Sequence, residues 1–279
     1  DWSVYFNKFI HYFIKIYKNL KMFKKELEAA IEAGLKAKEK ILEIYHTKFD
    51  VEIKSDHSPV TLADKMADQM IREILSTRFP TYAFLTEESE DNLERRKNDY
   101  VWIVDPVDGT KDFVAKDDEF TTNIALAYKG EVVVGVVLAP ALNEYYYATK
   151  NEGAFKFSNG KVTPIHVNDK LNNLTVLTSV FHQTENEKVV IVKYQDKIKN
   201  VMKVGSSLKA CRIAEGLAEI TYRLSDGTKE WDTAAMQLIV EEAGGVMVKP
   251  NGARITYNRE DVYNREGYII ANRKENILL

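Results

Sequence analysis

The sequence has a single cysteine among its 279 residues. One thiol cannot form an internal disulfide, and it cannot supply the several sulfur ligands of a cysteine-rich zinc site. This scarcity is typical of proteins of the reducing cytoplasm, which is the localisation that we expect. Because Cys211 falls within an apolar helical pattern, we expect it to be a small buried packing residue and not a nucleophile.

The sequence also lacks an excess of positive charge. Lys and Arg number 39, Asp and Glu number 42, and the formal net charge is −3. This balance argues against a nucleic-acid partner held by bulk positive charge, although it leaves a local basic patch open. Hydrophobic residues make up 45% of the chain, enough for a globular core, and the length suits one large domain or two smaller ones.

No apolar run is long and continuous enough to span a membrane. The aromatic-rich segment 1–21 comes nearest, but His11 and Lys15 interrupt it and no small-residue cleavage site follows. Two hypotheses stay open for this N-terminal extension: it precedes a natural start at Met22, or it is a basic amphipathic helix for a membrane surface or a partner. Without it the chain carries 35 basic and 41 acidic residues, a net charge of −6. We assign no firm membrane partner.

The sequence has no internal repeat, low-complexity linker or joint rich in proline and glycine. Helical and strand patterns alternate, which is typical of an α/β protein. We expect two packed halves: 22–158, which binds metal, and 159–279, which completes the substrate site. Helices are predicted over 23–45, 61–78, 185–199, 207–217 and 232–243, and strands over 51–54, 101–104, 121–128, 131–139, 145–149, 154–157, 174–179, 201–204 and 219–223.

The strongest chemical signal is the segment Trp102–Thr110, in which an apolar strand runs into two carboxylates. Asp105 and Asp108 are three residues apart, and Pro106 stiffens the turn that we expect between them. Neighbouring carboxylates repel each other unless a cation lies between them. Oxygen ligands without nearby His or Cys favour Mg²⁺ over zinc. The alternative is a polar loop in which an Asp caps its own turn.

Three further acidic elements occur on separate segments of the chain. Asp64 has the position of a helix capping box, Glu87 belongs to a Glu pair, and Asp232 lies at the start of a predicted helix. Each also has a structural interpretation, as a helix cap or as part of a solvated loop. Together with the Asp pair above, they predict a nest of carboxylates for two or three Mg²⁺ ions. Such a site polarises a phosphate and lowers the pKa of bound water.

These elements match a known set of motifs in the expected order. Asp105–Thr110 matches D-P-[hydrophobic]-D-G-[ST], and Val60–Asp64 matches V-T-x-x-D. The E-E, W-D and G-A-F elements of the set match Glu87-Glu88, Trp231-Asp232 and Gly153–Phe155. Over most of its length the sequence resembles the lithium-sensitive, Mg²⁺-dependent phosphomonoesterases of the inositol monophosphatase and fructose-1,6-bisphosphatase superfamily. The resemblance implies a layered α-β-α-β-α fold of the sugar-phosphatase type, with the site between its halves, inhibition by Li⁺ and, in many members, a homodimer.

The resemblance also implies a role for each acidic residue. Glu87, Asp105 and the carbonyl of Val107 would hold the first Mg²⁺. Asp105, Asp108 and Asp232 would hold the second, and a third would be bound more loosely near Glu87.

The nucleophile and the phosphate are assigned in the same way. Asp64 and Thr110 would activate the attacking water, with Asp64 taking the proton of the Thr110 hydroxyl and Glu87 assisting at the metals. The N–H groups of Gly109 and Thr110 would bind the phosphate, as backbone nests and helix N-termini do.

Three segments resemble the bisphosphate nucleotidase branch of this superfamily: Lys54–Thr61, Gly205–Lys209 and Lys229–Ala235. The first residue of the last segment is then a candidate substrate contact, Lys229. In the inositol branch, an acidic residue a few positions before the W-D aspartate binds the ring hydroxyls. Here that place falls on Ser225, next to an aspartate, so the inositol pattern fails or needs a shift.

The G-S-S-L-K segment has the chemistry of an anion site. We expect Gly205, Ser206 and Ser207 to open a helix, with free N–H groups and two hydroxyls for a second phosphate. Lys209 would add a compact positive charge. The alternative is plain helix capping by Ser.

One segment departs from the branch. Many nucleotidases have S-[RK]-S-H where this chain has Ser179–His182, so the basic residue is missing. His182 is a candidate substrate contact, with a structural or surface histidine as the alternative.

We therefore expect an Mg²⁺-dependent enzyme that hydrolyses the 3′-phosphate of adenosine 3′,5′-bisphosphate to AMP and phosphate. The alternative is an inositol monophosphatase or a broad sugar phosphatase acting on substrates such as fructose-1,6-bisphosphate. A non-catalytic nucleotide-binding regulator on the same scaffold is disfavoured, because binding alone needs neither Thr110 nor Asp64. The expected partner is a small phosphorylated molecule and not a nucleic acid.

Overall fold

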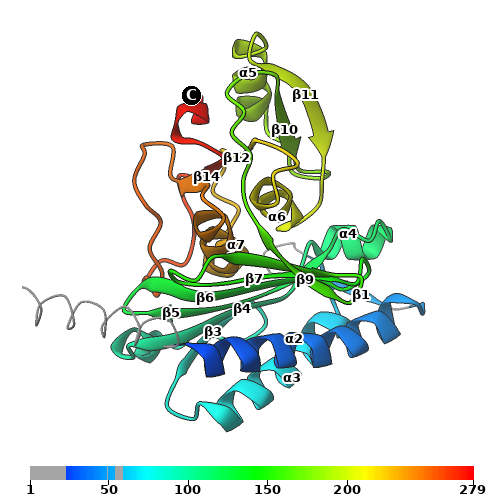
Figure 1. Ribbon diagram of the computed structural model, residues 1–279. Coiled ribbons are helices and arrows are strands. Elements are labelled where there is room, and N and C mark those ends of the chain that lie inside the picture. The colour runs from blue at the N-terminus through cyan, green and yellow to red at the C-terminus, as the bar shows by residue number, and fades with distance from the viewer. Residues whose placement is uncertain (1–22, 49, 54–58) are drawn as a thin grey trace, which may run out of the picture.

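The computed structural model describes residues 23–48, 50–53 and 59–279. Its helices and sheets alternate in layers: a helix pair, a seven-stranded sheet, a second helix pair, a five-stranded sheet and an outer helix (Figure 1). This is the α-β-α-β-α arrangement that the family resemblance implies. The expectations for segment 1–21 and for the strand end at Lys54 lie outside the described residues.

The first helix layer consists of α2 (Lys24–Tyr45) and α3 (Leu62–Arg78), which pack against each other and against the seven-stranded sheet. α2 buries small side chains at helical spacing, namely Ala29, Ala33 and Ala37. Small side chains let the helix axis lie close to the sheet. In the described residues no helix has the length and apolarity needed to cross a membrane.

The seven-stranded sheet has the order β3-β4-β5-β6-β7-β8-β9, with only the β3–β4 pair parallel. The junction that we expected near residue 158 falls within the β8–β9 hairpin, so the sheet continues seven residues further, to Ile165. The strands are β3 (Ala83–Thr86), β4 (Tyr100–Asp108), β5 (Thr121–Tyr128), β6 (Glu131–Ala139), β7 (Glu144–Thr149), β8 (Ala154–Ser158) and β9 (Lys161–Ile165).

The five-stranded sheet has the order β11-β10-β12-β14-β13 and mixes parallel and antiparallel pairs. Its strands are β10 (Leu174–Thr178), β11 (Ile198–Lys203), β12 (Ile220–Arg223), β13 (Val246–Val248) and β14 (Tyr268–Ala271). The outer helix α5 (Glu185–Lys193) connects β10 to β11. The second helix layer, α6 (Leu208–Ala214) and α7 (Glu230–Glu242), lies between the two sheets (Figure 1).

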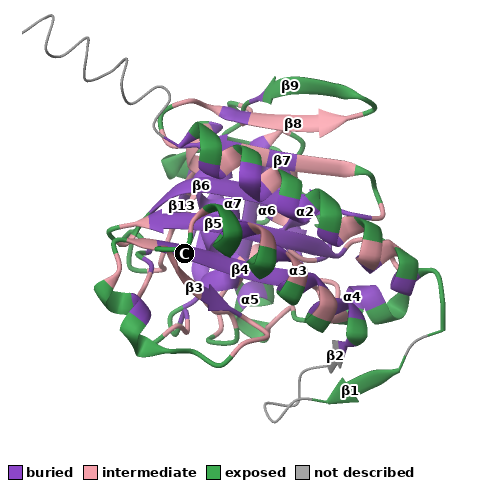
Figure 2. Ribbon diagram, turned by 90° about the horizontal axis from the view of Figure 1, so that it is seen from below, coloured by how far each residue is buried: buried purple, intermediate pink, exposed green. Residues whose placement is uncertain are grey.

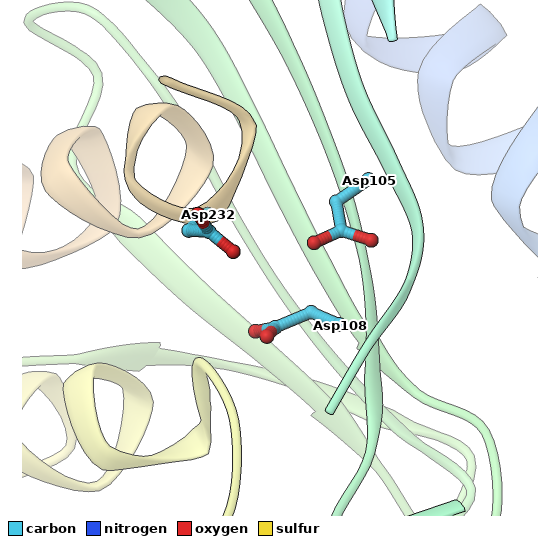
Figure 3. Close-up of side chains that lie close together, drawn as sticks. All are labelled: Asp105, Asp108 and Asp232. Carbon is cyan, nitrogen blue, oxygen red and sulfur yellow. The ribbon is translucent and has the colours of Figure 1, made fainter. Parts of the chain in front are cut away.

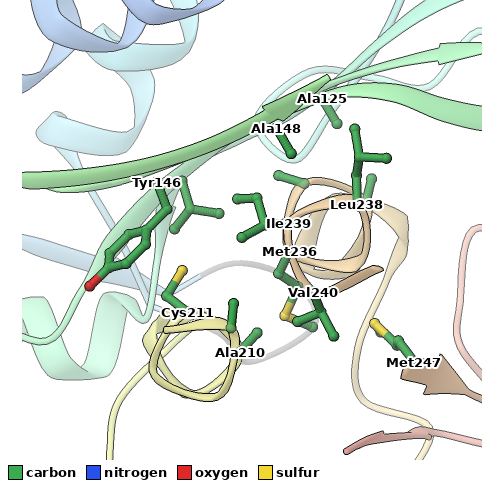
Figure 4. Packing of buried hydrophobic residues seen from close by; sticks show 14 of the residues in the cluster. Ala125, Tyr146, Ala148, Ala210, Cys211, Met236, Leu238, Ile239, Val240 and Met247 are labelled. Atoms are coloured by element: carbon green, nitrogen blue, oxygen red, sulfur yellow. The ribbon is translucent and has the colours of Figure 1, made fainter. Parts of the chain in front are cut away.

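The largest apolar cluster fills the space between the sheets and the helices α6 and α7 (Figure 4). α7 is buried on nearly all sides, as a helix enclosed between two sheets must be. The central strands β4, β5 and β6 of the seven-stranded sheet are buried as well, whereas β9 at its edge is largely exposed (Figure 2). Cys211 lies in this cluster with no exposed surface, and burial raises the pKa of its thiol. The expectation that it is a packing residue is confirmed.

Tertiary pairing overrides several local predictions. The helix predicted over 185–199 ends at Lys193, because the chain turns and enters β11, which pairs with β10. Short elements that we did not predict include β2 (Pro59–Thr61), β3, β9, α4 (Thr110–Ala115) and the 3₁₀ helices Leu93–Lys97 and Lys274–Asn276. The predicted strand 51–54 is observed as β1 (Val51–Ile53).

Candidate active site

A β-bulge near the end of β4 brings Asp105 and Asp108 to the same face of the sheet. Asp105 pairs with Asn123 and Asp108 with Thr121, so three steps along β4 match two along β5. In a regular strand, residues three apart point to opposite faces, and the extra residue removes that difference. The turn that we expected between the two carboxylates is therefore wrong: β4 continues through Asp108, and the Thr122 hydroxyl bonds to a carbonyl in the bulge at 2.8 Å.

Asp232 approaches the Asp pair from the first turn of α7. The N–H of Lys229 donates to its Oδ2 atom, which completes one half of a capping box. One carboxylate oxygen from each of Asp105, Asp108 and Asp232 lies within 4.8 Å of the others (Figure 3). No other group of three such side chains in the described part of the chain comes this close.

Asp108 is oriented by donors that all reach the same oxygen. Its Oδ2 accepts the N–H of Ser207 at 2.8 Å and the Ser207 hydroxyl at 2.7 Å. The side-chain amide of Asn123 donates to it at 3.2 Å, and the Thr121 hydroxyl lies at the same distance. These contacts hold the Asp108 carboxylate in place, with one of its oxygens close to those of Asp105 and Asp232.

The electrostatics of this cluster suit a divalent cation. Burial raises the pKa of Asp105 well above its ordinary value, and the nearby negative charges, beginning with Glu87, raise it further. Burial, followed by the charge of Asp108, raises the pKa of Asp232 to about 8. The buried Oδ1 of Asp105 has no hydrogen-bond partner among the described residues. A set of hard oxygens with one unpartnered atom fits Mg²⁺.

Glu87 reaches the same place from the end of β3. Its N–H donates to the carbonyl of Val104 at 3.2 Å, which holds the start of the following loop against β4. Its side chain lines the same cleft as Asp105 and interacts with that carboxylate. The structure thus brings together four of the five carboxylates predicted for the nest.

The fifth carboxylate, Asp64, has two partners at once. Its Oδ2 accepts the N–H of Thr61 at 2.8 Å and the Thr61 hydroxyl at 2.6 Å, which is the predicted capping box at the start of α3. Its Oδ1 accepts the Thr110 hydroxyl at 3.3 Å. The structural and the chemical interpretations of Asp64 are therefore compatible, because each would use a different oxygen, and its part in the reaction stays a prediction.

Thr110 begins the short helix α4, directly after Gly109. Gly109 has φ +84°, and a Cβ there would lie 3.0 Å from Asp112 Oδ2 and 3.1 Å from the Cβ of Ser206. Both the left-handed conformation and the crowding require glycine at this position. Gly109, Thr110 and Val107 all line the cleft, whereas the N–H contacts to a phosphate stay a prediction.

These groups surround a cleft of about 500 Å³, within the ordinary range for small-ligand sites. Its walls come from β4 and α4 and, much later in the sequence, from the start of α6, β12 and the start of α7. Of the predicted site residues, Asp64 and Gly205 do not line it. The predicted residues that do are Glu87, Asp105, Val107, Asp108, Gly109, Thr110, His182, Ser206, Ser207, Lys209, Lys229 and Asp232.

Comparison with known proteins identifies the family. The sequence model of the family described as "Inositol monophosphatase family" matches residues 23–278. The chain belongs to the inositol monophosphatase family. The resemblance seen in the motifs is thereby confirmed over nearly the whole described chain.

Several relatives in this family carry a more specific name. The 3′(2′),5′-bisphosphate nucleotidase CysQ of Buchnera aphidicola is 36% identical over 243 residues, covering 85% of this chain and 89% of that protein. The protein of the same name from Salmonella typhimurium is 35% identical, with 87% and 98% covered. The crystal structure of CysQ from Bacteroides thetaiotaomicron superimposes with a TM-score of 0.80 at 36% identity, covering 90% of this chain and 99% of that one. An IMPase of Thermotoga maritima gives a TM-score of 0.75 at 28% identity, with 89% and 92% covered.

The polar groups of the G-S-S-L-K segment have other hydrogen-bond partners than the sequence predicts. The N–H of Gly205 donates to Glu119 Oε2 at 2.7 Å, and the Ser206 hydroxyl donates to the Glu119 carbonyl at 2.7 Å. Ser207 is engaged by Asp108, as described above. The N–H groups of Gly205 and Ser207 and both serine hydroxyls, which we predicted to be free for a second phosphate, are therefore bonded within the protein. The helix α6 begins only at Leu208.

The remaining predicted contacts lie on the wall of the cleft. Lys209 Nζ donates to the carbonyls of Val204 at 3.2 Å and Ser206 at 2.6 Å. His182 is exposed, and its carbonyl accepts Arg223 Nη1 at 2.7 Å. The ammonium of Lys229 lies 5.3 Å from the ring centres of Trp231 and Tyr263.

Sequence reasoning missed Asn123 and Thr121, which hold Asp108 from the neighbouring strand. Both are fully buried polar residues in the otherwise apolar β5. A buried polar residue requires a hydrogen-bond partner, so polar positions in an apolar strand next to the Asp pair were the available signal. No motif in the sequence pointed to Arg223 or Lys111, which add positive charge to the cleft.

Proposed function

We propose that this protein hydrolyses the 3′-phosphate of adenosine 3′,5′-bisphosphate, in the presence of Mg²⁺, to AMP and phosphate. The observation that supports phosphomonoesterase activity is the convergence of three carboxylates beside the Asp64–Thr110 pair. The choice of substrate is supported by the relatives named as bisphosphate nucleotidases, which this chain matches over most of their length.

In this proposal Asp105, Asp108 and Asp232, with Glu87 and the carbonyl of Val107, hold two or three Mg²⁺ ions. When bound, the ions polarise the phosphate ester and lower the pKa of the attacking water.

The chain's own groups handle the proton and the phosphate. The Thr110 hydroxyl passes its proton to Asp64 Oδ1, and it can then accept a proton from the water that it orients. The first N–H groups of α4, which have no partner within the helix, bind the phosphate oxygens.

The rest of the cleft supports a second anionic group on the substrate. Lys111, Arg223, Lys229 and Arg265 all line it, and Tyr263 offers an aromatic face beside two of these cations. A bisphosphate nucleotide carries a second phosphate and a base, which match positive charge and an aromatic ring respectively.

One observation favours a second candidate, an inositol monophosphatase. Asp226 lines the cleft, close to the place where that branch has an acidic residue for ring hydroxyls. An exposed carboxylate there would repel a second phosphate and accept hydrogen bonds from a sugar.

A comparison of kcat/KM at saturating Mg²⁺ tests the proposal. The substrates are adenosine 3′,5′-bisphosphate, inositol 1-phosphate and fructose-1,6-bisphosphate, and the first is expected to be preferred by at least about tenfold, or 1.4 kcal/mol. A clear preference for inositol 1-phosphate overturns the substrate assignment, and no phosphate release from any of them overturns catalysis. Asp105→Asn, prepared in parallel, serves as the control for contaminating phosphatases.

A further inference from the structure

The segment Gly205–Ser206, just before α6, is hydrogen-bonded to the turn that precedes β5. Glu119, in that turn, accepts the N–H of Gly205 on its carboxylate and the Ser206 hydroxyl on its carbonyl, each at 2.7 Å. The N–H of Glu119 in turn donates to Asp117 Oδ1 at 3.0 Å, which fixes the turn itself. Two hydrogen bonds thus join this turn to a segment that lies 86 to 87 positions further along the sequence.

The two segments also lie too close for any side chain at Gly205. A Cβ there would lie 2.6 Å from the Glu119 carbonyl and 2.6 Å from Asp112 Oδ1. The glycine of the G-S-S-L-K segment is therefore explained by close contact with Glu119, and not by contact with a ligand, since it does not line the cleft.

Lys209 holds the same segment from its other side. Its ammonium donates to the carbonyls of Val204 and Ser206, while Glu119 takes the donors of Gly205 and Ser206. Ser206 itself has φ +41°, a conformation that costs a residue with a Cβ on the order of 1 kcal/mol or more unless its surroundings impose it. The contacts from Glu119 and Lys209 supply that constraint.

The next residue shows what this constraint achieves. Ser207 directs both its N–H and its hydroxyl to Asp108 Oδ2. A shift of the Gly205–Ser206 segment would move both donors together and leave the carboxylate with only the longer contacts to Asn123 and Thr121, each at 3.2 Å. Groups that orient a ligand from behind commonly change metal affinity by about 10–100-fold when they are removed.

We infer that Glu119 is a positioning residue of the metal centre: it holds Gly205 and Ser206 so that Ser207 can orient Asp108 for the cation. The inference rests on the proposed function only in placing a divalent cation at the carboxylate cluster. It requires the reach of the Glu119 side chain more than its charge, because the bond to Gly205 needs an acceptor at that distance.

The experiment separates reach from charge by measuring Mn²⁺ binding without substrate, by electron paramagnetic resonance, in the full chain. Glu119→Gln keeps an acceptor at the same reach and loses the charge, so its Kd is expected within about threefold of the unmodified protein. Glu119→Asp keeps the charge and shortens the reach, so its Kd is expected to rise about tenfold, as in Glu119→Ala. If Glu119→Ala fails to fold, the Asp and Gln variants still decide.

Asp118→Ala is the matched control, because it removes the same charge from the adjacent residue, whose side chain bonds instead to Tyr45 at 2.8 Å. Its Kd is expected to stay unchanged. The inference is overturned if Glu119→Asp binds Mn²⁺ normally, or if Glu119→Gln and Asp118→Ala weaken binding as much as Glu119→Ala. Failure of the unmodified protein to hydrolyse bisphosphate nucleotides would overturn the proposed function and leave these binding results unaffected.

Discussion

The Oδ1 atom of Asp64 lies 3.3 Å from the hydroxyl of Thr110, while its Oδ2 atom is held by Thr61 at the start of α3. The cap fixes the carboxylate on a rigid helix end and leaves one oxygen directed at the hydroxyl. A proton acceptor that is held in this way loses no reorientation time or entropy at each turnover. The hydroxyl also lies 3.2 Å from the carbonyl of Val107, a second acceptor that keeps it beside the carboxylates.

The role of this pair predicts a selective loss of turnover. Thr110→Val removes the hydroxyl with little change of shape, and kcat is expected to fall by about a hundredfold or more. Thr110→Ser keeps the hydroxyl and should retain most of the activity. Steady-state kinetics on both variants, with Mg²⁺ binding measured by calorimetry, checks this. A Thr110→Val enzyme with normal kcat would remove Thr110 from the proton path.

Asp105 is expected to trade stability for metal binding. Asp105→Asn should lower kcat by several orders of magnitude, because a ligand oxygen is lost. In EDTA at pH 8 the same variant should melt at a higher temperature than the unmodified protein, since a buried charge that repels its neighbours is gone. Differential scanning calorimetry with and without Mg²⁺ measures both effects. An unchanged kcat contradicts the metal role, and a lower melting temperature in EDTA contradicts the repulsion.

Proton and metal ion should compete for the cluster. The pKa of Asp232 is raised to about 8, so below that pH a proton must leave before a cation can bind. If one proton is displaced, the Mg²⁺ concentration at half-saturation is expected to rise up to about tenfold for each pH unit below 8, and to level off above it. Titrations at pH 6, 7, 8 and 9 test this, and a flat response over that range would exclude it.

Asp112, on α4, offers a prediction on stability alone. Burial raises its pKa to about 7, together with the charge of Asp117 and a hydrogen bond that the protonated carboxyl donates to Asp117. The folded state then holds the proton more tightly than the unfolded state, so this carboxyl costs stability as the pH rises from about 4 to 7. Asp112→Asn should therefore stabilise the protein at pH 8 by on the order of 1–3 kcal/mol, and by less at pH 5.

Urea unfolding in EDTA at the two pH values measures this difference. Asp99→Asn, on an exposed side chain, is the control and should show little change between them. Equal stabilisation by Asp112→Asn at pH 5 and pH 8 would mean that the carboxyl is not the titrating group.

The sequence predicts most elements of the fold, because their signals are local. The helices α2 and α3 and the paired strands β5 and β6 lie where the periodicity places them. β11 was predicted late and α5 too long, because the pairing of β11 with β10 depends on a neighbour that local pattern does not reveal. The β4 bulge is hidden for the same reason, since it exists only in the register with β5.

The acidic residues, their order and the preference for Mg²⁺ followed from the sequence by itself, because ligand type and close spacing are local properties. Only the tertiary structure decided what holds those ligands. Ser207 reaches Asp108 across 99 residues of sequence, and Glu119 occupies the donors of Gly205 and Ser206 that local chemistry assigned to a phosphate. A polar group forms its hydrogen bond with whichever partner the packed chain brings near it. Here the packing of α4, β4, β5 and the start of α6 against one another determines that partner.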